Sequence, residues 1–239
     1  MVVQILHTLL AFSALSNFIL GVLVLTRRKS DLSVKLFSLT AFCASGWGIA
    51  TLMLLTHPNF IFDQIATITG AFTIGFLGLY ISSFSNLTKK ERYLSWVYFF
   101  GFSLFFSLMT IRPGIFIMPT SEVINETIIV TADRGPLQGS FGLFGLFAFI
   151  IYLVLFIKAY RGAVGKKRTQ IKYVFLACII SSVIALVTNL FLPTLGIPVY
   201  GGLGPICSLF FVAITANSII KNEIFHIKIF LSEIIVFIF

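Results

Sequence analysis

Side chains that could carry out acid–base, nucleophilic or metal chemistry are few and far apart in this sequence. The three histidines, His7, His57 and His226, lie near the start of one apolar run, between two others, and in the tail. They are therefore not expected to share a site. The motifs of metalloproteases and serine hydrolases, His-Glu-x-x-His and Gly-x-Ser-x-Gly, do not occur. We expect no catalytic residue, no metal ligand and no cofactor, so the chain is not predicted to be an enzyme.

Cysteine chemistry is not expected either. Cys43, Cys178 and Cys207 lie inside separate apolar runs, and none belongs to a Cys-x-x-Cys pair. Disulfide frameworks need paired cysteines in an oxidising, water-facing segment. An isolated cysteine in an apolar run packs as a small apolar side chain. We therefore interpret all three as packing residues.

Polar side chains that could contact a ligand inside the apolar runs are also scarce. Asp63 stands near the outer mouth of the third run, and Glu91 belongs to a basic cluster before the fourth. Three asparagines, Asn17, Asn189 and Asn217, lie within runs. Asparagines in such runs either hydrogen-bond between helices or give a cavity a polar lining, and both interpretations stay open. The candidate ligand-pocket residues are Asn17, Asp63 and Asn189.

The elements that must position these side chains are membrane helices. Of the 239 residues, 58% are hydrophobic and only 10% are charged, whereas soluble domains average about 25% charged residues. The positive charge lies in short clusters between apolar runs, which argues against nucleic-acid binding. Backbone groups in lipid must pair within their own segment, so we predict an all-α bundle of seven transmembrane helices. The predicted spans are 2–26, 34–56, 61–85, 93–111, 139–157, 171–192 and 200–220.

Orientation follows from the distribution of lysine and arginine. All of the 17 basic residues except Arg112 and Arg134 fall in every second connection or in the tail. Because basic loops stay in the cytoplasm, the pattern predicts an outer N-terminus and a cytoplasmic C-terminus. It fits seven spans and would break if one span were added or removed.

The connection before the fifth span is the longest on the predicted outer face. Residues 127–131 are typical of a strand, and Arg134-Gly135-Pro136 is a turn signal. We expect a small extracytoplasmic β-hairpin here.

Small residues recur four positions apart in the second and third runs. Such pairs allow membrane helices to approach closely. We interpret them as packing sites within the bundle rather than as a dimerisation motif. The pairs are Ala44 with Gly48, Ala66 with Gly70, and Ala71 with Gly75.

Several segments, taken in order, resemble one known family. They are 134–137 (RGPL), 169–176 (TQIKYVFL), 187–193 (VTNLFLP), 203–206 (LGPI) and 224–228 (IFHIK). Together they resemble the N-terminal seven-transmembrane sensor region of bacterial sensor histidine kinases. The likeness runs over essentially the whole chain. One departure is His226, which stands where that family usually has aspartate.

The resemblance implies a sensory input module in a bacterial cytoplasmic membrane. Residues 1–220 would form the sensor, and 221–239 would begin a truncated signalling linker. It implies a cytoplasmic histidine kinase or other signalling protein as partner, and a homodimer. No phosphoacceptor or ATP-binding segment follows the last run, so this chain is not expected to phosphorylate anything. The expected signal-exit residues are Ile224, Phe225, His226, Ile227 and Lys228.

Two other interpretations stay open at this point. The chain could be a fragment of a truncated or split sensor kinase. It could instead be a small-molecule transporter or channel, although the scarcity of membrane charges and the absence of an internal repeat disfavour this. The stimulus is not identified by the sequence.

Overall fold

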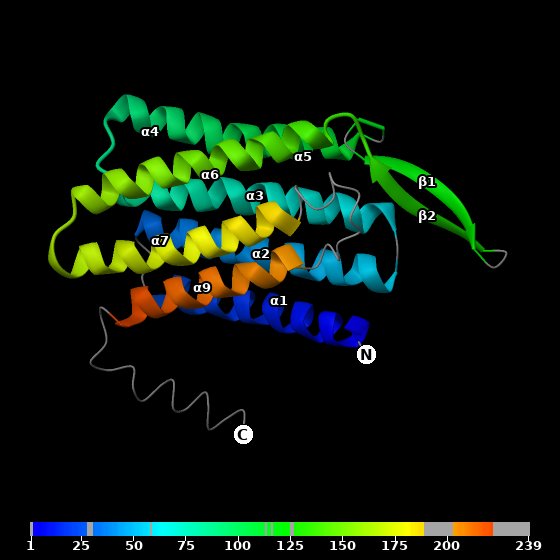
Figure 1. The fold of residues 1–239 in the computed structure, drawn as a ribbon, viewed down its shortest axis with the longest axis horizontal. Helices are drawn as coiled ribbons and strands as arrows, with labels where there is room; N and C mark the ends of the chain where they lie inside the picture. The colour runs from blue at the N-terminus through cyan, green and yellow to red at the C-terminus, as the bar shows by residue number, and fades with distance from the viewer. Residues whose placement is uncertain are drawn as a thin grey trace, which may run out of the picture.

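Long helices form most of the fold. The structure, a computed structural model, describes residues 2–27, 31–57, 59–112, 114–115, 117–124, 127–188 and 203–221. Figure 1 shows the helices lying roughly parallel to one another, with a hairpin projecting from one end. The elements are α1 (Val2–Arg27), α2 (Leu32–Thr56), α3 (Phe60–Phe84), α4 (Lys89–Trp96), η1 (Val97–Gly101), α5 (Phe102–Ile111), β1 (Ile117–Ile124), β2 (Thr127–Arg134), α6 (Gln138–Arg161), α7 (Gly165–Leu186) and α9 (Leu203–Lys221).

Local sequence explains where three of these helices begin. Asp31 and Asn59 precede α2 and α3, and each side chain accepts a hydrogen bond from the backbone N–H two residues later. Thr88 and Glu91 form a reciprocal capping box at the start of α4. Each cap satisfies an N–H group that the helix itself leaves unpaired.

The contacts between helices define a ring. α2 packs on α3, α3 on α6, α6 on α7, and α7 on α9, while α9 also contacts α2. Helix α1 lies outside this ring, against α2 and α9, and α5 lies outside it against α3. Among the described elements, five helices therefore surround the centre of the bundle.

Six helical segments of the described chain are long and apolar enough to cross a membrane. They are α1, α2, α3, the continuous segment α4–η1–α5, α6 and α7. This confirms the prediction of a multi-pass helical bundle. The apolar stretch found in α9, Leu203–Thr215, is shorter than those six. Whether the predicted seventh span crosses the bilayer is therefore still a prediction.

One face of α6 illustrates how the bundle meets lipid. Leu143, Phe147, Ile150 and Val154 recur at helical spacing, and each is roughly half exposed. A row of exposed large apolar side chains suits contact with hydrocarbon, because lipid tails are as apolar as the side chains themselves.

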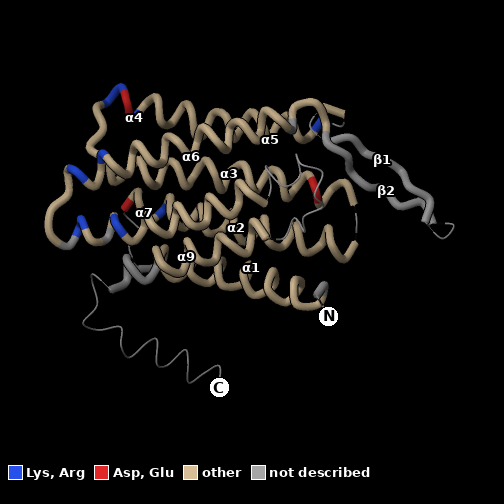
Figure 2. The backbone as a smooth tube through the Cα atoms, in the orientation of Figure 1, with Lys and Arg blue, Asp and Glu red and all other residues tan. Residues whose placement is uncertain are grey.

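Basic side chains gather at one end of the bundle. Figure 2 shows Lys and Arg where α3 leads into α4 and where α6 leads into α7. Lys35 in the first turn of α2 belongs to the same end, whereas Arg112 follows α5 at the other end. The structure thus brings together the connections that the sequence assigned to the cytoplasm. We call this the cationic end and the opposite one the hairpin end.

A two-stranded antiparallel hairpin, β1–β2, follows α5 and Arg112. Its register pairs Ile117 with Arg134 and Ile124 with Thr127. The sequence placed a hairpin in this connection, but the signal Arg134-Gly135-Pro136 is not its turn. That segment closes β2 and leads into α6, and Leu137 N–H donates to Ile115 C=O at 3.2 Å.

The helix that contains the fourth predicted span, 93–111, begins before that span. The capping box starts the helix at Lys89, and a π-helical turn, η1, interrupts it at Val97–Gly101. Phe99 within this turn is fully buried against α3. A π-turn shifts the helical register by a fraction of a turn, and apolar periodicity alone does not reveal it.

The tightest packing lies in the half of the bundle toward the cationic end. Phe37, Tyr80 and Phe156 are almost completely buried there. Phe37 contacts the ring of Tyr80 at 5.5 Å and that of Phe211 at 6.4 Å between centroids. These rings close the centre of the bundle toward the cationic end.

Candidate functional site

A cavity of about 540 Å³ lies inside the ring of five helices. Its walls come from α2, α3, α6, α7 and α9, with Gly135 added from the turn before α6. No described residue of α1, α4 or α5 lines it. The volume falls in the range of about 300–1,000 Å³ that is typical of small-molecule sites.

Glycine and alanine create much of this space. Gly139, Gly142 and Gly145 recur every third residue along α6 and line the cavity. A Cβ atom added at Gly145 would come no closer than 3.9 Å to Ile74 or Leu186. One added at Gly139 would meet nothing within 4 Å. These glycines therefore leave room rather than allow helices to touch.

The small-residue pairs found in the sequence divide into two roles. Ala44, Ala66 and Gly70 line the cavity. Gly48 and Gly75 instead stand at helix contacts inside the chain. A Cβ at Gly48 would lie 3.2 Å from Ala14 Cβ, and one at Gly75 would lie 2.8 Å from Phe99 O. At both of these contacts the packing is intramolecular.

Hydroxyl groups provide much of the polarity of the walls, and most of them already donate their protons to backbone carbonyls. Thr40, Thr51 and Thr73 each donate to the backbone carbonyl four residues earlier at 2.8 Å. Ser181 of α7 donates to Cys207 C=O at 2.9 Å, and Ser208 to Pro205 C=O at 2.6 Å. Toward the interior such hydroxyls offer mainly oxygen lone pairs.

The inner limit of the cavity is aromatic. Tyr152 of α6 donates its hydroxyl proton to Ile74 C=O. Phe211 of α9 lines the cavity and also contacts Phe37. The described lining residues nearest the cationic end are Val212 on α9 and Tyr152 on α6. Both helices continue well beyond these residues before they reach that end. The cavity thus occupies the hairpin half of the bundle and is closed on its other side.

Of the three pocket candidates, the structure places one on the cavity wall. Asp63, in the first turn of α3, lines its hairpin end. Asn17 does not line it. Its Nδ2 donates to Ser208 Oγ at 2.7 Å, which joins α1 to α9. Asn189 and the side chain of Asn217 lie outside the described residues, as do all five signal-exit residues, 224–228.

Helix α9 is fastened to α1 by buried polar groups. Ser13 Oγ donates to Pro205 C=O at 2.9 Å, one helical turn from the Asn17–Ser208 bond. Asn17 is fully buried, and its Oδ1 has no hydrogen-bond partner. Burying an unpaired amide oxygen costs free energy, so this contact is a point of low stability beside the cavity wall.

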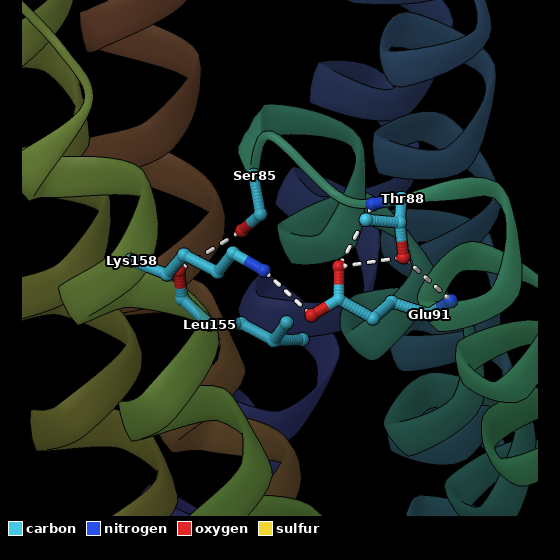
Figure 3. A network of polar contacts seen from close by, with 5 residues as sticks. All are labelled: Ser85, Thr88, Glu91, Leu155 and Lys158. Carbon is cyan, nitrogen blue, oxygen red and sulfur yellow. Dashed lines mark hydrogen bonds and ion pairs between the residues drawn. The ribbon is translucent and has the colours of Figure 1, made fainter.

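A second polar cluster joins the α3–α4 connection to α6 at the cationic end (Figure 3). Lys158 Nζ lies 2.7 Å from Glu91 Oε1, and Ser85 Oγ donates to Leu155 C=O at 2.9 Å. Glu91 Oε2 accepts from the backbone N–H of Thr88 at 2.8 Å. An ion pair thus joins the start of the peripheral segment α4–η1–α5 to α6.

The environment of Glu91 favours its ionised form. The residue stands in the polar first turn of α4, ahead of the apolar run that starts at Tyr93. The hydrogen bond from Lys158, followed by those from Thr88, lowers the pKa of the Glu91 carboxyl to about 2. Both side chains of the ion pair are exposed to solvent, so its contribution to stability is small.

Within the described residues, no group of three or more His, Cys, Asp or Glu side chains is arranged to hold a metal ion. Among the described residues, the cavity lining contains one carboxylate, Asp63, one cysteine, Cys178, and no lysine, arginine or histidine. The described lining can enclose and orient a small molecule.

Sequence reasoning identified Asp63 but missed most of the cavity wall. The signal that could have found it is the spacing of Gly139, Gly142 and Gly145, which puts three residues without side chains on one helix face. Small residues in membrane helices usually indicate close packing. Only the three-dimensional structure separates the two roles.

When compared with known families and proteins, the chain matches no family model and no curated protein sequence.

Proposed function

We propose that this chain is a membrane-embedded sensory input module that binds its stimulus in the central cavity and passes the response through α9 to a cytoplasmic kinase. The observation that carries the proposal is that α9 supplies part of the cavity wall, through Gly204, Ser208 and Phe211. The same helix leads into segment 221–239, where the sequence places the signal exit.

The physical basis is differential affinity between two packings of the bundle. A ligand in contact with α9 favours whichever packing it binds more tightly. The Asn17–Ser208 bond joins the cavity wall on α9 to α1, which lies outside the ring, and Asn17 Oδ1 there has no hydrogen-bond partner. A small rotation of α9 would exchange these contacts at low cost, because the existing arrangement leaves a buried acceptor unsatisfied.

Sidedness completes the proposal. The hairpin end would face outward and the cationic end would face the cytoplasm, because basic connections are retained inside. The N-terminus would then be extracytoplasmic, the predicted seventh span would cross the bilayer, and the chain would belong to a bacterial cytoplasmic membrane. The resemblance to sensor regions of histidine kinases supports this, as does a cavity that reaches only one end of the bundle.

A chimaera tests the proposal. The chain is fused at its C-terminus to the phosphoacceptor and ATP-binding domains of a sensor kinase, and autophosphorylation is measured in lipid nanodiscs. Gly145→Leu, which fills the cavity, is expected to change the rate several-fold. Gly101→Leu is the matched control, because a Cβ at Gly101 meets nothing within 4 Å and Gly101 does not line the cavity.

Equal rates in the two variants and the parent chimaera would contradict a sensory role. Uptake assays in sealed vesicles distinguish the transporter interpretation. Accumulation of a compound that binds the cavity, driven by an ion gradient and abolished by Gly145→Leu, would favour transport instead.

A further inference from the structure

The cationic end of the bundle has a dense positive charge. Residues 89–92 and 158–172 contain nine basic residues and one acidic residue. The Glu91–Lys158 ion pair brings the first turn of α4 against the last turn of α6, and Figure 2 shows both segments at the same end. We define the cationic patch as the exposed basic side chains of these segments that take no part in that pair. They are Lys89, Lys90, Arg92, Arg161, Lys167, Arg168 and Lys172.

Little negative charge balances the cationic patch. Glu91 is the one acidic residue in its two segments, and the Glu91 carboxylate is bonded to Lys158. Exposed cations that lie near one another repel, and an anion held between them relieves that repulsion. Guanidinium groups bind phosphate through paired hydrogen bonds, and lysine binds it as a point charge. The patch is therefore complementary to a layer of phosphate groups.

The side chains beside the patch place it at the level of lipid head groups. On α4, α6 and α7, a basic residue is followed by a tyrosine and then by an exposed large apolar residue toward the middle of the bundle. Tyrosine is enriched where head groups meet hydrocarbon, and long basic side chains extend outward from that boundary. The three series are Arg92, Tyr93 and Val97 on α4, Arg161, Tyr160 and Ile157 on α6, and Lys172, Tyr173 and Leu176 on α7.

The length of the peripheral segment agrees with this depth. Arg92 lies in the first turn of α4, and Arg112 follows the last residue of α5. The two arginines are about twenty residues apart, which corresponds to about 30 Å at a rise of about 1.5 Å per residue. The hydrocarbon core of a bilayer is also about 30 Å thick. If Arg112 lies at one boundary of the hydrocarbon, Arg92 therefore lies at the other.

We propose that the cationic patch binds the phosphate head groups of anionic phospholipids, such as phosphatidylglycerol, in preference to zwitterionic phosphatidylcholine. The acyl chains of the bound lipid lie on the exposed apolar rows that continue from the patch along α6 and α7. Each basic residue near a membrane surface is expected to favour anionic lipid by up to about fivefold at low ionic strength. The proposal is independent of the sensory role and of the orientation in the cell, because a symmetric bilayer offers the same lipids to both ends.

Trp96 provides a reporter for the test. It is partly exposed and lies about one helical turn from Arg92. The chain has two tryptophans, and Trp47→Phe leaves Trp96 as the only one. The full-length Trp47→Phe chain is reconstituted in phosphatidylcholine bilayers that contain a small fraction of phosphatidylglycerol brominated in its acyl chains. Bromine quenches tryptophan fluorescence at short range, so quenching of Trp96 reports the lipid beside the patch.

The measured quantity is the ratio of quenching by brominated phosphatidylglycerol to quenching by brominated phosphatidylcholine at the same mole fraction. We expect phosphatidylglycerol to be preferred several-fold. The preference should shrink as ionic strength rises from about 0.05 to about 0.5 M, because salt screens exposed charges. Equal quenching by the two lipids at low salt would overturn the proposal.

Substitutions assign the effect to the patch. Arg92→Gln and Arg161→Gln are each expected to reduce the preference by up to about fivefold. Arg112→Gln, the same change at the hairpin end, is expected to leave it unchanged. Glu91→Gln is expected to increase it, because Lys158 then loses its acidic partner. An equal decrease in Arg112→Gln, or a decrease in Glu91→Gln, would overturn the assignment.

A measurement on the unaltered chain decides the proposal even if a variant fails to fold. The chain is purified in detergent micelles that contain equal amounts of phosphatidylglycerol and phosphatidylcholine. Native mass spectrometry then identifies the lipids that stay bound. Retention of phosphatidylglycerol in excess is expected, and retention of both lipids in equal proportion would contradict the proposal.

Discussion

At the residue scale, hydroxyl groups make two kinds of hydrogen bond in this bundle. Some serines donate across helix interfaces: Ser45 to Ala14 C=O, Ser103 to Ala71 C=O, and Ser13 to Pro205 C=O. Threonines such as Thr40 and Thr73 donate back to their own helix. A serine that joins two helices is part of the tertiary structure, whereas a threonine bonded within one helix affects mainly that helix.

This difference can be measured on α2. Ser45→Ala removes an interhelical bond at a buried position and is expected to destabilise the bundle by about 0.6 kcal/mol, the average for such bonds in membranes. Thr40→Val preserves shape and removes an intrahelical bond, so its effect is expected to be close to zero. Unfolding in mixed detergent micelles measures both. A larger loss for Thr40→Val would contradict the distinction.

The Glu91–Lys158 pair gives a pH prediction. The pKa of the Glu91 carboxyl is lowered to about 2 in the fold, so the folded state holds the ionised form more strongly than the unfolded chain does. Its stabilisation is fully present above the ordinary carboxyl pKa and is lost as pH falls toward the folded value. We expect Glu91→Gln to lower the thermal midpoint slightly and equally from pH 8 to pH 5.

The decrease should shrink as pH falls below about 4, near the ordinary glutamate value. Lys158→Met is expected to produce the same profile, and Lys90→Met to lack it, because Lys158 is the residue bonded to Glu91. A Glu91→Gln effect that grows on acidification would refute the assignment.

At the element scale, α3 has glycines where the peripheral segment α4–η1–α5 packs closely against it. Gly75 and Gly78 of α3 face η1 and α5, where Phe99 O and the Phe99 ring occupy the space that side chains would need. The π-turn turns Phe99 inward, and Ser103 then reaches Ala71 C=O. Because Gly75 and Gly78 have no side chains, α3 leaves room for the π-helical turn η1 of the neighbouring segment.

A methyl group tests this fit. Gly75→Ala would put Cβ 2.8 Å from a backbone oxygen that cannot easily move, so we expect a loss of about 1–3 kcal/mol from overpacking. Gly101→Ala, in η1 itself, adds the same group where nothing lies within 4 Å and is expected to be neutral or slightly stabilising. Thermal unfolding of both purified variants measures the difference. Equal effects would show that the approach of α5 does not depend on Gly75.

Element boundaries and the cavity show where sequence reasoning stops. Apolar runs near 20 residues predict membrane helices because lipid leaves the backbone no other way to pair, and the described part of the chain holds six helices long and apolar enough to cross a membrane. The start of α4 at Lys89 depends on the capping box at Thr88, a local bond that hydropathy does not register. The cavity depends on which glycines face another helix and which face open space. Which of these roles a glycine has depends on how α6 packs against α3 and α7. The sequence of a single apolar run therefore does not reveal it.

At the scale of the whole molecule, the basic connections meet at one end and the hairpin stands at the other (Figures 1 and 2). The basic connections therefore determine together how the bundle would be oriented across a bilayer. Reversing it would move every basic cluster across the bilayer at once, which the membrane potential and translocation both oppose.

Topology can be read from cysteine labelling of intact cells. With the three native cysteines replaced by alanine, Lys90→Cys and Lys167→Cys are expected to react with a membrane-impermeant maleimide only after permeabilisation. Arg112→Cys, exposed at the opposite end, is expected to react beforehand. Labelling of position 167 from outside intact cells would invalidate the sidedness and the direction of signalling based on it.

The two kinds of glycine also bear on how such a protein could diversify. At Gly139 an added Cβ would meet nothing within 4 Å, and at Gly145 it would come no closer than 3.9 Å to the side chains of Ile74 and Leu186. Single mutations there would shorten or narrow the space available to a guest molecule while the helix contacts at Gly48 and Gly75 stay as they are. Selectivity and foldability are thus encoded at separate positions, so ligand preference could drift between lineages while the scaffold is preserved.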